Sequence, residues 1–424
     1  MTTTSGFAQR RGAFRPHVRP EWVSRINEEG TCLDLRSVVP LDENSLLRTA
    51  RENTGLDDFG DDDWHERFHI LARSLDEESE LNLMGRLMTR GEMLALLEAR
   101  LHIEEAYKRF PEIADEEIVR PIFVIGQGRS GTSLLQNVLA ADPNHGTTRK
   151  WEVMWPWPPP ERDTYDTDPR IARVRDFANQ WDRVAPEMMA MHDFSCDAPT
   201  ESHQVLSLTF GSFGWISSVY GQAPSFVAHM QTQPMAPMHE YEKRVLKLLQ
   251  WKNPRRRWVM KSALSLTDLL AIREVYPDVA FVWAHRDPVK ALASMVNLVG
   301  TLHWSRSDRP FIDGFEALTS ADVSAWLLTL PIGWLESGEL PKEQLYNLQF
   351  QDLVADPLST VEGIYSYFGF DLSESSRRGM QKYLDENPRE RKPRHNYPVF
   401  AGNLELERQA YARYQHYFNV PNEI

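Results

Sequence analysis

The stretch from Pro121 to Ala141 constrains the fold of this chain more than any other part of its sequence. A continuous apolar run, Ile122 to Ile125, leads into the octet Gly-Gln-Gly-Arg-Ser-Gly-Thr-Ser at residues 126–133, and a helical pattern follows from Leu134. A strand, a glycine-rich turn and a helix in this order favour an anion site, because the first N–H groups of the helix and its dipole point toward the turn. We call residues 126–133 the glycine-rich loop.

Further apolar segments predict that this strand belongs to a parallel sheet. Three short strand candidates follow, at Trp258–Met260, Val279–Ala284 and Tyr346–Phe350. Helical patterns separate them, at residues 266–276, 289–299 and 321–330. Buried strands that alternate with helices are typical of a parallel sheet covered on both faces. The sequence therefore predicts an α/β fold in which helices flank a parallel sheet.

The rest of the chain is predicted to form three regions around this sheet. Residues 1–20 lack hydrophobic periodicity and are expected to be a flexible arm, and residues 21–120 form an N-terminal helical region. The α/β domain then covers residues 121–424 and carries a long insert at residues 150–255. This insert is rich in Trp, Met and Pro, and one helix is predicted within it at residues 202–220. Inserts of this length are usually lids or substrate-binding regions.

Composition argues against several classes of protein. The formal net charge is −14, whereas a protein that binds nucleic acid needs a broad basic surface. The two cysteines, Cys32 and Cys196, are far apart and lack the spacing of zinc ligands, so no disulfide framework and no metal site is predicted. No apolar stretch reaches the roughly 18 residues of a membrane-spanning helix, and the N-terminus has no apolar signal-peptide core. We therefore expect a cytoplasmic protein; the sequence does not indicate its oligomeric state.

The residues of the glycine-rich loop narrow the choice of anion. A Walker A loop, which binds ATP or GTP, requires Gly-Lys-Ser/Thr, and this chain has Gly-Thr-Ser at residues 131–133. The loop resembles the 5′-phosphosulfate loop of sulfotransferases that use PAPS (3′-phosphoadenosine-5′-phosphosulfate), whose pattern is Pro-Arg/Lys-Ser-Gly-Thr-Thr/Ser. The chain departs from that pattern at Gly128, where the family usually has proline. The resemblance is to the branch with Arg in the loop, which includes bacterial and tyrosylprotein sulfotransferases.

This resemblance implies a fold and a set of donor-binding residues. The fold would be a sheet of the P-loop-kinase type. The implied contacts to the 5′-phosphosulfate are made by Gly128, Arg129, Ser130, Gly131, Thr132 and Ser133. The family also places an Arg after a later strand and a Ser eight residues further on, both of which bind the 3′-phosphate. Here Arg286 follows the strand candidate that ends at Ala284, and Ser294 stands eight residues later.

A basic segment at residues 389–395 stands out in an otherwise acidic protein. A late basic loop closes over the 3′-phosphate in the family, so the resemblance implies this role for Lys392 and Arg394. A solvated charged loop is the alternative reading of the same residues.

The resemblance also implies residues for catalysis. Arg129 and Lys261, which follows a strand candidate, are expected to neutralise charge on the transferring group as the leaving group PAP departs. A general base must also take the proton of the acceptor. The tyrosylprotein branch uses a Glu beyond the helix of the loop, which makes Glu152 the first choice here. Glu201 or His203 is the second choice, and His303 is a third.

Taken together, these features predict sulfuryl transfer from PAPS to an acceptor hydroxyl or amine by in-line displacement, without a metal. The Trp- and Met-rich insert suggests an apolar acceptor such as a lipid, glycolipid, steroid or phenol. Two alternatives stay open at this point: a nucleotide-dependent kinase of the same architecture, and a non-catalytic module that binds PAP or another nucleotide.

Overall fold

Five short strands form one parallel sheet. They are β1 (Ile122–Ile125), β2 (His145–Gly146), β3 (Arg257–Ser262), β4 (Ala280–His285) and β5 (Leu345–Gln349). Their order is β2-β3-β1-β4-β5, and every neighbouring pair is parallel. This confirms the predicted α/β fold. The sequence indicated four of the strands; β2, with two residues, is too short to give a periodic signal.

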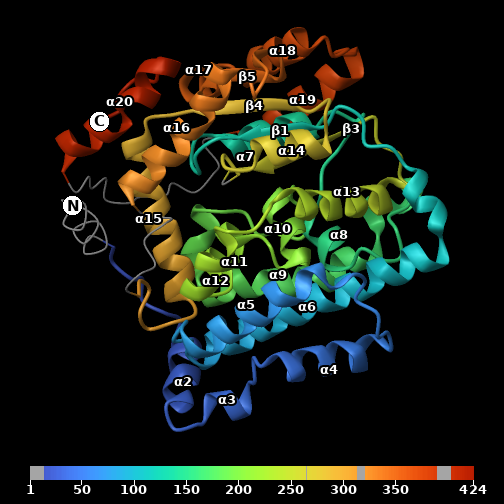
Figure 1. The fold of residues 1–424 in the computed structure, drawn as a ribbon, viewed down its shortest axis with the longest axis vertical. Coiled ribbons are helices and arrows are strands. Elements are labelled where there is room, and N and C mark those ends of the chain that lie inside the picture. The colour runs from blue at the N-terminus through green and yellow to red at the C-terminus, as the bar shows by residue number, and fades with distance from the viewer. Residues whose placement is uncertain (1–13, 264, 313–319, 389–402) are drawn as a thin grey trace.

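The computed structural model of the chain describes residues 14–263, 265–312, 320–388 and 403–424. Figure 1 shows the sheet crossing the upper part of the molecule, with helices above and below it. The helices that follow strands of the sheet are α7 (Thr132–Ala140), α14 (Leu269–Val275), α15 (Pro288–Trp304), α16 (Ala321–Ser337), α17 (Phe350–Ala355), α18 (Pro357–Phe368), α19 (Glu374–Glu386) and α20 (Leu404–Phe418).

The strands supply side chains to two separate cores. Ile122 and Val124 of β1 belong to an apolar cluster shared with α7, α17, α18 and α19, whereas Phe123 and Ile125 belong to a larger cluster on the other face. Successive side chains of a strand point to opposite faces, so a strand covered on both sides needs an unbroken apolar run. The run at residues 122–125 is fully buried for this reason.

The larger core extends far beyond the sheet. It includes side chains from most of the N-terminal helices and from the helices between β2 and β3. The N-terminal helices are α2 (Glu21–Gly30), α3 (Leu35–Val38), α4 (Glu43–Thr54), α5 (His65–Glu77) and α6 (Leu83–Arg109). The helices between β2 and β3 are α8 (Lys150–Met154), α9 (Pro169–Val184), α10 (Ser202–Leu206), α11 (Phe213–Val219), α12 (Pro224–Met230) and α13 (Ala236–Gln250). Because these helices share one core with the sheet, the division at residues 20, 120, 150 and 255 stays a prediction.

Short 3₁₀ turns connect several of these elements. They are η1 (Asp62–Trp64), η2 (Pro111–Asp115), η3 (Arg162–Thr167), η4 (Pro186–Ala190), η5 (Ser207–Thr209) and η6 (Lys342–Gln344). The turn η5 and the residues after it interrupt the helix predicted at residues 202–220. Phe210 takes a left-handed conformation with φ 53°, and a Cβ atom at Gly211 would lie 2.1 Å from Sδ of Met238. The chain must bend here, so α10 ends at Leu206.

The N-terminal arm is described only from Phe14 onward, since residues 1–13 lie outside the described part of the chain. Phe14 is buried and packs against Gly300 of α15. The Arg19 guanidinium stacks on the Trp304 ring at 3.6 Å and donates to the carbonyl of Trp304. Phe14 and Arg19 thus contact α15, whereas residues 15–18 between them are exposed, and the flexible arm at residues 1–20 stays a prediction.

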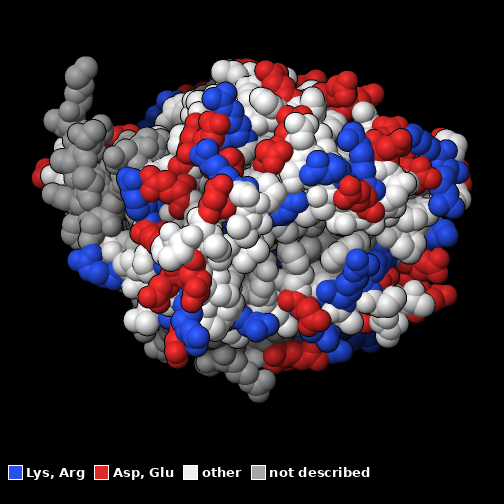
Figure 2. Space-filling view, turned by 90° about the horizontal axis from the view of Figure 1, so that it is seen from below, with Lys and Arg blue, Asp and Glu red and all other residues white. Residues whose placement is uncertain are grey.

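The surface carries both signs of charge. On the face seen in Figure 2, acidic and basic side chains are interspersed. Within the described residues, no helix combines the length and the apolar character needed to cross a membrane.

Candidate active site

The parallel sheet brings the predicted site residues to one edge. The glycine-rich loop follows Ile125 of β1, Lys261 lies near the end of β3, and Arg286 follows β4. β1 lies between β3 and β4, with Val124 opposite Lys261 and Ile125 opposite Trp283. The segments that leave these three strands are therefore neighbours. Ligands of open α/β sheets bind at this carboxyl edge, on either side of the central strand.

The glycine-rich loop has an unusual backbone. Gly126 and Gly131 have φ of 142° and 93°, and Arg129 has φ of 75° although it carries a side chain. A positive φ is uncommon for a residue other than glycine and persists only where the surroundings enforce it, often at a functional site. The helix α7 begins directly afterwards at Thr132, so its first N–H groups point toward the loop.

Gly128 departs from the family pattern for a reason visible in the packing. A Cβ atom at this position would lie 1.9 Å from Cε of Met295 on α15. The end of the Met295 side chain thus fills the space that a proline ring at residue 128 would need.

The two donor-binding signatures meet in space. Arg129 donates through Nε to Oγ of Ser294 at 3.1 Å, although 165 residues separate them. Arg286 donates through Nη1 to the carbonyl of Arg129 at 2.8 Å. A further hydrogen bond of 2.6 Å joins Nη1 of Arg129 to the carbonyl of Met191 in the insert. The structure therefore brings together residues that the sequence suggested through two independent motifs.

Arg286 also has an acidic partner that no motif indicated. Glu423 accepts hydrogen bonds from Nε and Nη2 of Arg286 at 2.8 and 3.1 Å, and Lys290 lies 3.1 Å from the same carboxylate. Despite its partial burial, these two cations lower the pKa of Glu423. The guanidinium of Arg286 further lies over the ring of Phe350 at 4.0 Å. Sequence reasoning missed Glu423 because it lies 137 residues from Arg286.

Lys261 stands between the glycine-rich loop and the insert. Its side chain is almost fully buried, and Nζ lies 2.9 Å from Oγ of Ser133 and 2.9 Å from Oε1 of Glu201. An ammonium group has three N–H donors. Two are used by these contacts, and the third has no acceptor among the described residues, so Lys261 can bind one more oxygen.

Two buried hydroxyl groups at the same edge also lack partners. Oγ of Ser130 in the loop and Oγ of Ser262 at the end of β3 have no hydrogen-bond partner among the described residues. Buried hydroxyls are nearly always hydrogen-bonded, so each such group calls for an explanation. With Arg129 and Lys261 beside them, these groups fit a bound phosphate or sulfate group, whose oxygens accept hydrogen bonds.

Glu201, the second choice for a base, is the carboxylate that touches this cluster. It lies directly before α10 and is 8% exposed. Burial opposes ionisation, but Lys261 and the neighbouring histidines lower the pKa of Glu201. One of those histidines, His192, was missed by the sequence analysis because it belongs to no motif. Burial and the charge of Lys261 lower the pKa of His192 to about 4, so its ring is neutral at physiological pH.

Glu152, the first choice, has other neighbours. It is completely buried, accepts the backbone N–H of Arg149 at 2.8 Å and thereby caps the start of α8. Burial raises the pKa of Glu152 against the charges of Arg255 and Arg149 and a hydrogen bond from Tyr165. None of these belongs to the glycine-rich loop or to the end of β3. The base role of Glu152 stays a prediction, and the contacts favour Glu201.

The two candidate histidines are held by other contacts. The ring nitrogens of His203 lie 3.1 and 3.2 Å from the hydroxyls of Ser212 and Ser265. Those of His303 lie within 2.9 Å of two backbone carbonyls. Burial lowers the pKa of both. The base role of both histidines stays a prediction. Lys392 and Arg394, predicted to close over the 3′-phosphate, lie outside the described residues.

A buried ionic network supports the segment that carries Glu201. His239 on α13 is fully buried and lies 2.9 Å from Oε2 of Glu242 and 3.8 Å from Oδ2 of Asp268. The same Glu242 accepts a hydrogen bond from Ser202, the first residue of α10. Burial alone would lower the pKa of His239, but these two carboxylates raise it from 6.5 to about 9.

Stability should therefore fall as the pH rises through this range. The protonated ring of His239 stabilises the fold because its pKa is higher in the folded than in the unfolded chain. This contribution is fully present below pH 6.5 and is lost as the ring deprotonates at about pH 9. We expect a loss on the order of 2 kcal/mol in the free energy of unfolding between pH 6.5 and 9. Urea denaturation of the wild type and of His239→Gln measures it. The variant should be less stable at pH 6.5 and should show a flatter profile, whereas parallel profiles would contradict the assignment.

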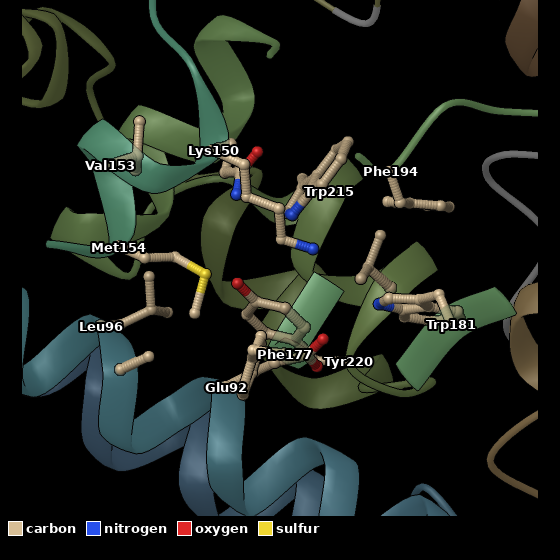
Figure 3. A pocket seen from close by; sticks show the side chains of 13 residues that line it. Glu92, Leu96, Lys150, Val153, Met154, Phe177, Trp181, Phe194, Trp215 and Tyr220 are labelled. Atoms are coloured by element: carbon tan, nitrogen blue, oxygen red, sulfur yellow. The ribbon is translucent and has the colours of Figure 1, made fainter. Parts of the chain in front are cut away.

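An apolar pocket borders residues 191–204, the insert segment that contacts Lys261 and Arg129. Its lining is mostly apolar and includes the aromatic side chains of Phe177, Trp181, Phe194, Trp215 and Tyr220, so we call it the aromatic pocket (Figure 3). Phe194 stacks on Trp181 and contacts the ring of His192 at 4.5 Å. Gln204, one turn after Glu201, lines the pocket too. Residues 191–204 thus border both the pocket and the cluster around Lys261.

Comparison with known proteins assigns the class. A model of the sulfotransferase family matches residues 121–374, which is more than half of the chain. The chain therefore belongs to the sulfotransferase family, as the resemblance of the glycine-rich loop implied. The structure adds that the residues of both family signatures lie together at the carboxyl edge of the sheet.

Individual relatives come from mycobacteria. The omega-hydroxy-beta-dihydromenaquinone-9 sulfotransferase Stf3 of Mycobacterium bovis is 21% identical over 278 residues, which are 63% of this chain and 67% of the relative. The sulfotransferase STF1 of Mycobacterium tuberculosis matches with a TM-score of 0.71 and 28% identity over 88% of this chain and 98% of its own. The sulfotransferase STF9 of Mycobacterium avium shares the fold, with a TM-score of 0.77 and 23% identity over 90% and 98%.

Proposed function

We propose that this sulfotransferase moves a sulfuryl group from PAPS to a hydroxyl group, or an amine, of an apolar small molecule. The observation that carries the proposal is the convergence of Arg129, Ser294 and Lys261 around a loop whose buried Ser130 hydroxyl lacks a partner. Membership in the sulfotransferase family supports this reading over a nucleotide-dependent kinase.

The donor would bind along the carboxyl edge of the sheet. The loop N–H groups, Arg129 and Ser130 would hold the 5′-phosphosulfate, and Arg286 and Ser294 the 3′-phosphate. Bound PAPS supplies an activated sulfuryl group. Positioning and charge stabilisation are the main tasks of the protein in such a displacement. Lys261 suits the second task, because its third N–H can bind an oxygen that gains charge as the S–O bond to PAP breaks.

Glu201 is the group best placed to take the acceptor proton. Its carboxylate is ionised and lies 2.9 Å from Lys261, so it lies beside the group that would bind the transferring oxygen. In the proposed step, the acceptor oxygen forms the new bond to sulfur while its proton moves to Glu201. The negative charge of the leaving group is balanced by Lys261 and Arg129.

The aromatic pocket is the proposed acceptor site. Small-molecule sites are mostly apolar cavities with a few polar groups, and this pocket shares the segment 191–204 with the cluster around Lys261. The curated relative is named for a hydroxylated menaquinone, an apolar acceptor with a hydroxyl group. An acceptor of that general kind, apolar with one hydroxyl, fits the lining of this pocket.

Thermal unfolding with nucleotides tests the donor assignment. PAP at about 100 times its dissociation constant should stabilise the wild type by about 2.7 kcal/mol, without magnesium. ATP, ADP and AMP at the same concentration should have smaller effects, since they lack the 3′-phosphate. Arg286→Ala should weaken the effect of PAP, whereas Lys342→Ala, a change of an exposed residue in the turn η6 before β5, should not. A shift with ATP and magnesium and none with PAP would favour the kinase and overturn the proposal.

A further inference from the structure

The aromatic pocket contains an ammonium group that is nearly buried and has no hydrogen-bond or ion-pair partner among the described residues. Lys150 is the first residue of α8, and its side chain points into the space between Trp181 and Trp215 (Figure 3). The residue is only 7% exposed. Its Nζ forms no hydrogen bond and no ion pair with any described residue. A buried charge is normally paired, because removing it from water is unfavourable unless other groups replace the water.

The acidic groups around Lys150 do not form an ion pair with it. Glu92 on α6 faces the same pocket, but it is engaged by Arg306 at 2.5 Å. Asp182 on α9 acts on Lys150 electrostatically without bonding to it. The pKa of the Cys196 thiol is raised by burial, so this group is neutral at physiological pH. Since Glu92 and Arg306 offset each other, the charge of Lys150 remains at the pocket wall.

Aromatic rings provide the remaining surroundings of this ammonium. Nζ lies 5.5 Å from the centroid of Phe194 and 5.9 Å from that of Phe177. Ring faces attract a cation, but they do not replace the strong hydrogen bonds of water. The unused donors of Lys150 therefore point into a space that an acceptor molecule would occupy.

We propose that Lys150 binds an anionic oxygen group of the acceptor, in the simplest case a carboxylate. The acceptor is then an apolar or aromatic hydroxy acid, with the hydroxyl directed to Lys261 and the anionic group to Lys150. This inference rests on the proposed function, since it takes the aromatic pocket as the acceptor site. It makes Lys150 a specificity-determining residue that selects an anionic acceptor over a neutral one of the same shape.

The pH dependence of binding follows from the environment of Lys150. Burial lowers the pKa of Lys150 to about 8, against the opposing charge of Glu92. The groups that face it from neighbouring elements are Glu92, Arg306, Asp182 and Cys196. At pH 7 the ammonium is charged and can bind an anion, and above pH 8 the free protein loses this charge. Affinity for an anionic ligand should therefore decrease from pH 7 to pH 9.5.

Two probes that differ only in charge test the proposal by calorimetric titration. They are 6-hydroxy-2-naphthoate and 6-hydroxy-2-naphthamide, which have the same aromatic body and the same hydroxyl. We expect the wild type to bind the carboxylate about 10- to 100-fold more tightly than the amide. Lys150→Met keeps the side-chain length and removes the charge, so this preference should disappear. Lys342→Met, the same change at an exposed position on the opposite edge of the sheet, should keep it.

Several results would overturn the inference. They are equal binding of the two probes to the wild type, binding of neither, or an unchanged preference in Lys150→Met. If Lys150→Met does not fold, titrations of the wild type at two pH values still test the proposal. The preference of the wild type for the carboxylate probe must fall at least about tenfold between pH 7 and 9.5. These titrations use no donor, so they are independent of PAP binding. Failure of PAP to stabilise the protein would overturn the proposed function, and loss of charge selectivity alone would overturn the role of Lys150.

Discussion

Lys261→Met is expected to lower kcat for sulfuryl transfer from PAPS to 2-naphthol by about 10²- to 10³-fold. Lys261 is the buried cation whose free N–H would meet the transferring group, so its loss raises the barrier of the chemical step. Its effect on PAP binding should be small, because PAP lacks the sulfuryl group. Turnover, followed as the release of PAP, and the affinity for PAP should be measured on the same preparation. The two measurements separate an effect on the chemical step from an effect on donor binding. The substitution also leaves Glu201 without its ion-pair partner, so a lower thermal stability is expected.

The matched comparison is Arg129→Met. Arg129 bonds to Ser294 and accepts a bond from Arg286 through its carbonyl, which places it among the proposed phosphate contacts. Its loss should weaken PAP binding as well as turnover. A Lys261→Met protein that is folded, binds PAP and retains kcat within threefold of the wild type would exclude Lys261 from the transfer step.

Glu201→Gln should lower kcat with the same acceptor by about 10²- to 10⁴-fold, whereas Glu152→Gln should leave it near the wild-type value. Glutamine has the size of glutamate but cannot accept the proton. Glu201 lies against Lys261, while Glu152 caps α8 and contacts Arg149. PAP affinity should be similar in both variants. Turnover with saturating PAPS therefore compares two buried carboxylates within one protein.

The opposite result has a clear meaning as well. If Glu152→Gln loses turnover with PAP binding intact and Glu201→Gln does not, then Glu152 is the base that the family resemblance first indicated. The Lys261–Glu201 pair would then be a structural ion pair between β3 and the insert. Loss of turnover in both variants would indicate that removal of the acceptor proton needs both carboxylates.

Local sequence features were enough to predict the sheet and the glycine-rich loop. The strands β1, β3 and β4 are buried on both faces, and such strands show a continuous hydrophobic signal. Arg286 and Ser294 were identified through the family resemblance, whose second signature has a fixed spacing between the end of one strand and the helix that follows it. Contacts of this kind depend on short stretches of chain, which a sequence displays directly.

The remaining parts of the site depend on contacts between distant segments. Glu201 became the preferred carboxylate only because the insert folds back on the end of β3 and meets Lys261. His192, Lys150 and Glu423 have ordinary sequence surroundings, and their roles come from neighbours on other elements of the fold. The break between α10 and α11 has the same origin, since Met238 of α13 fixes the space beside Gly211.

The pairing of Arg286 with Glu423 changes how donor binding must be understood. If Arg286 holds the 3′-phosphate, as proposed, then binding is an ion exchange in which one anion replaces another on the same guanidinium. The electrostatic gain is only the difference between the phosphate and the carboxylate, because Arg286 is never a bare charge. The carboxylate of Glu423 must then be hydrated or pair with another cation, and Lys290 already lies 3.1 Å from it. The donor site thus carries its own counterion, so the number of cations around the phosphate overstates both the affinity and its dependence on salt.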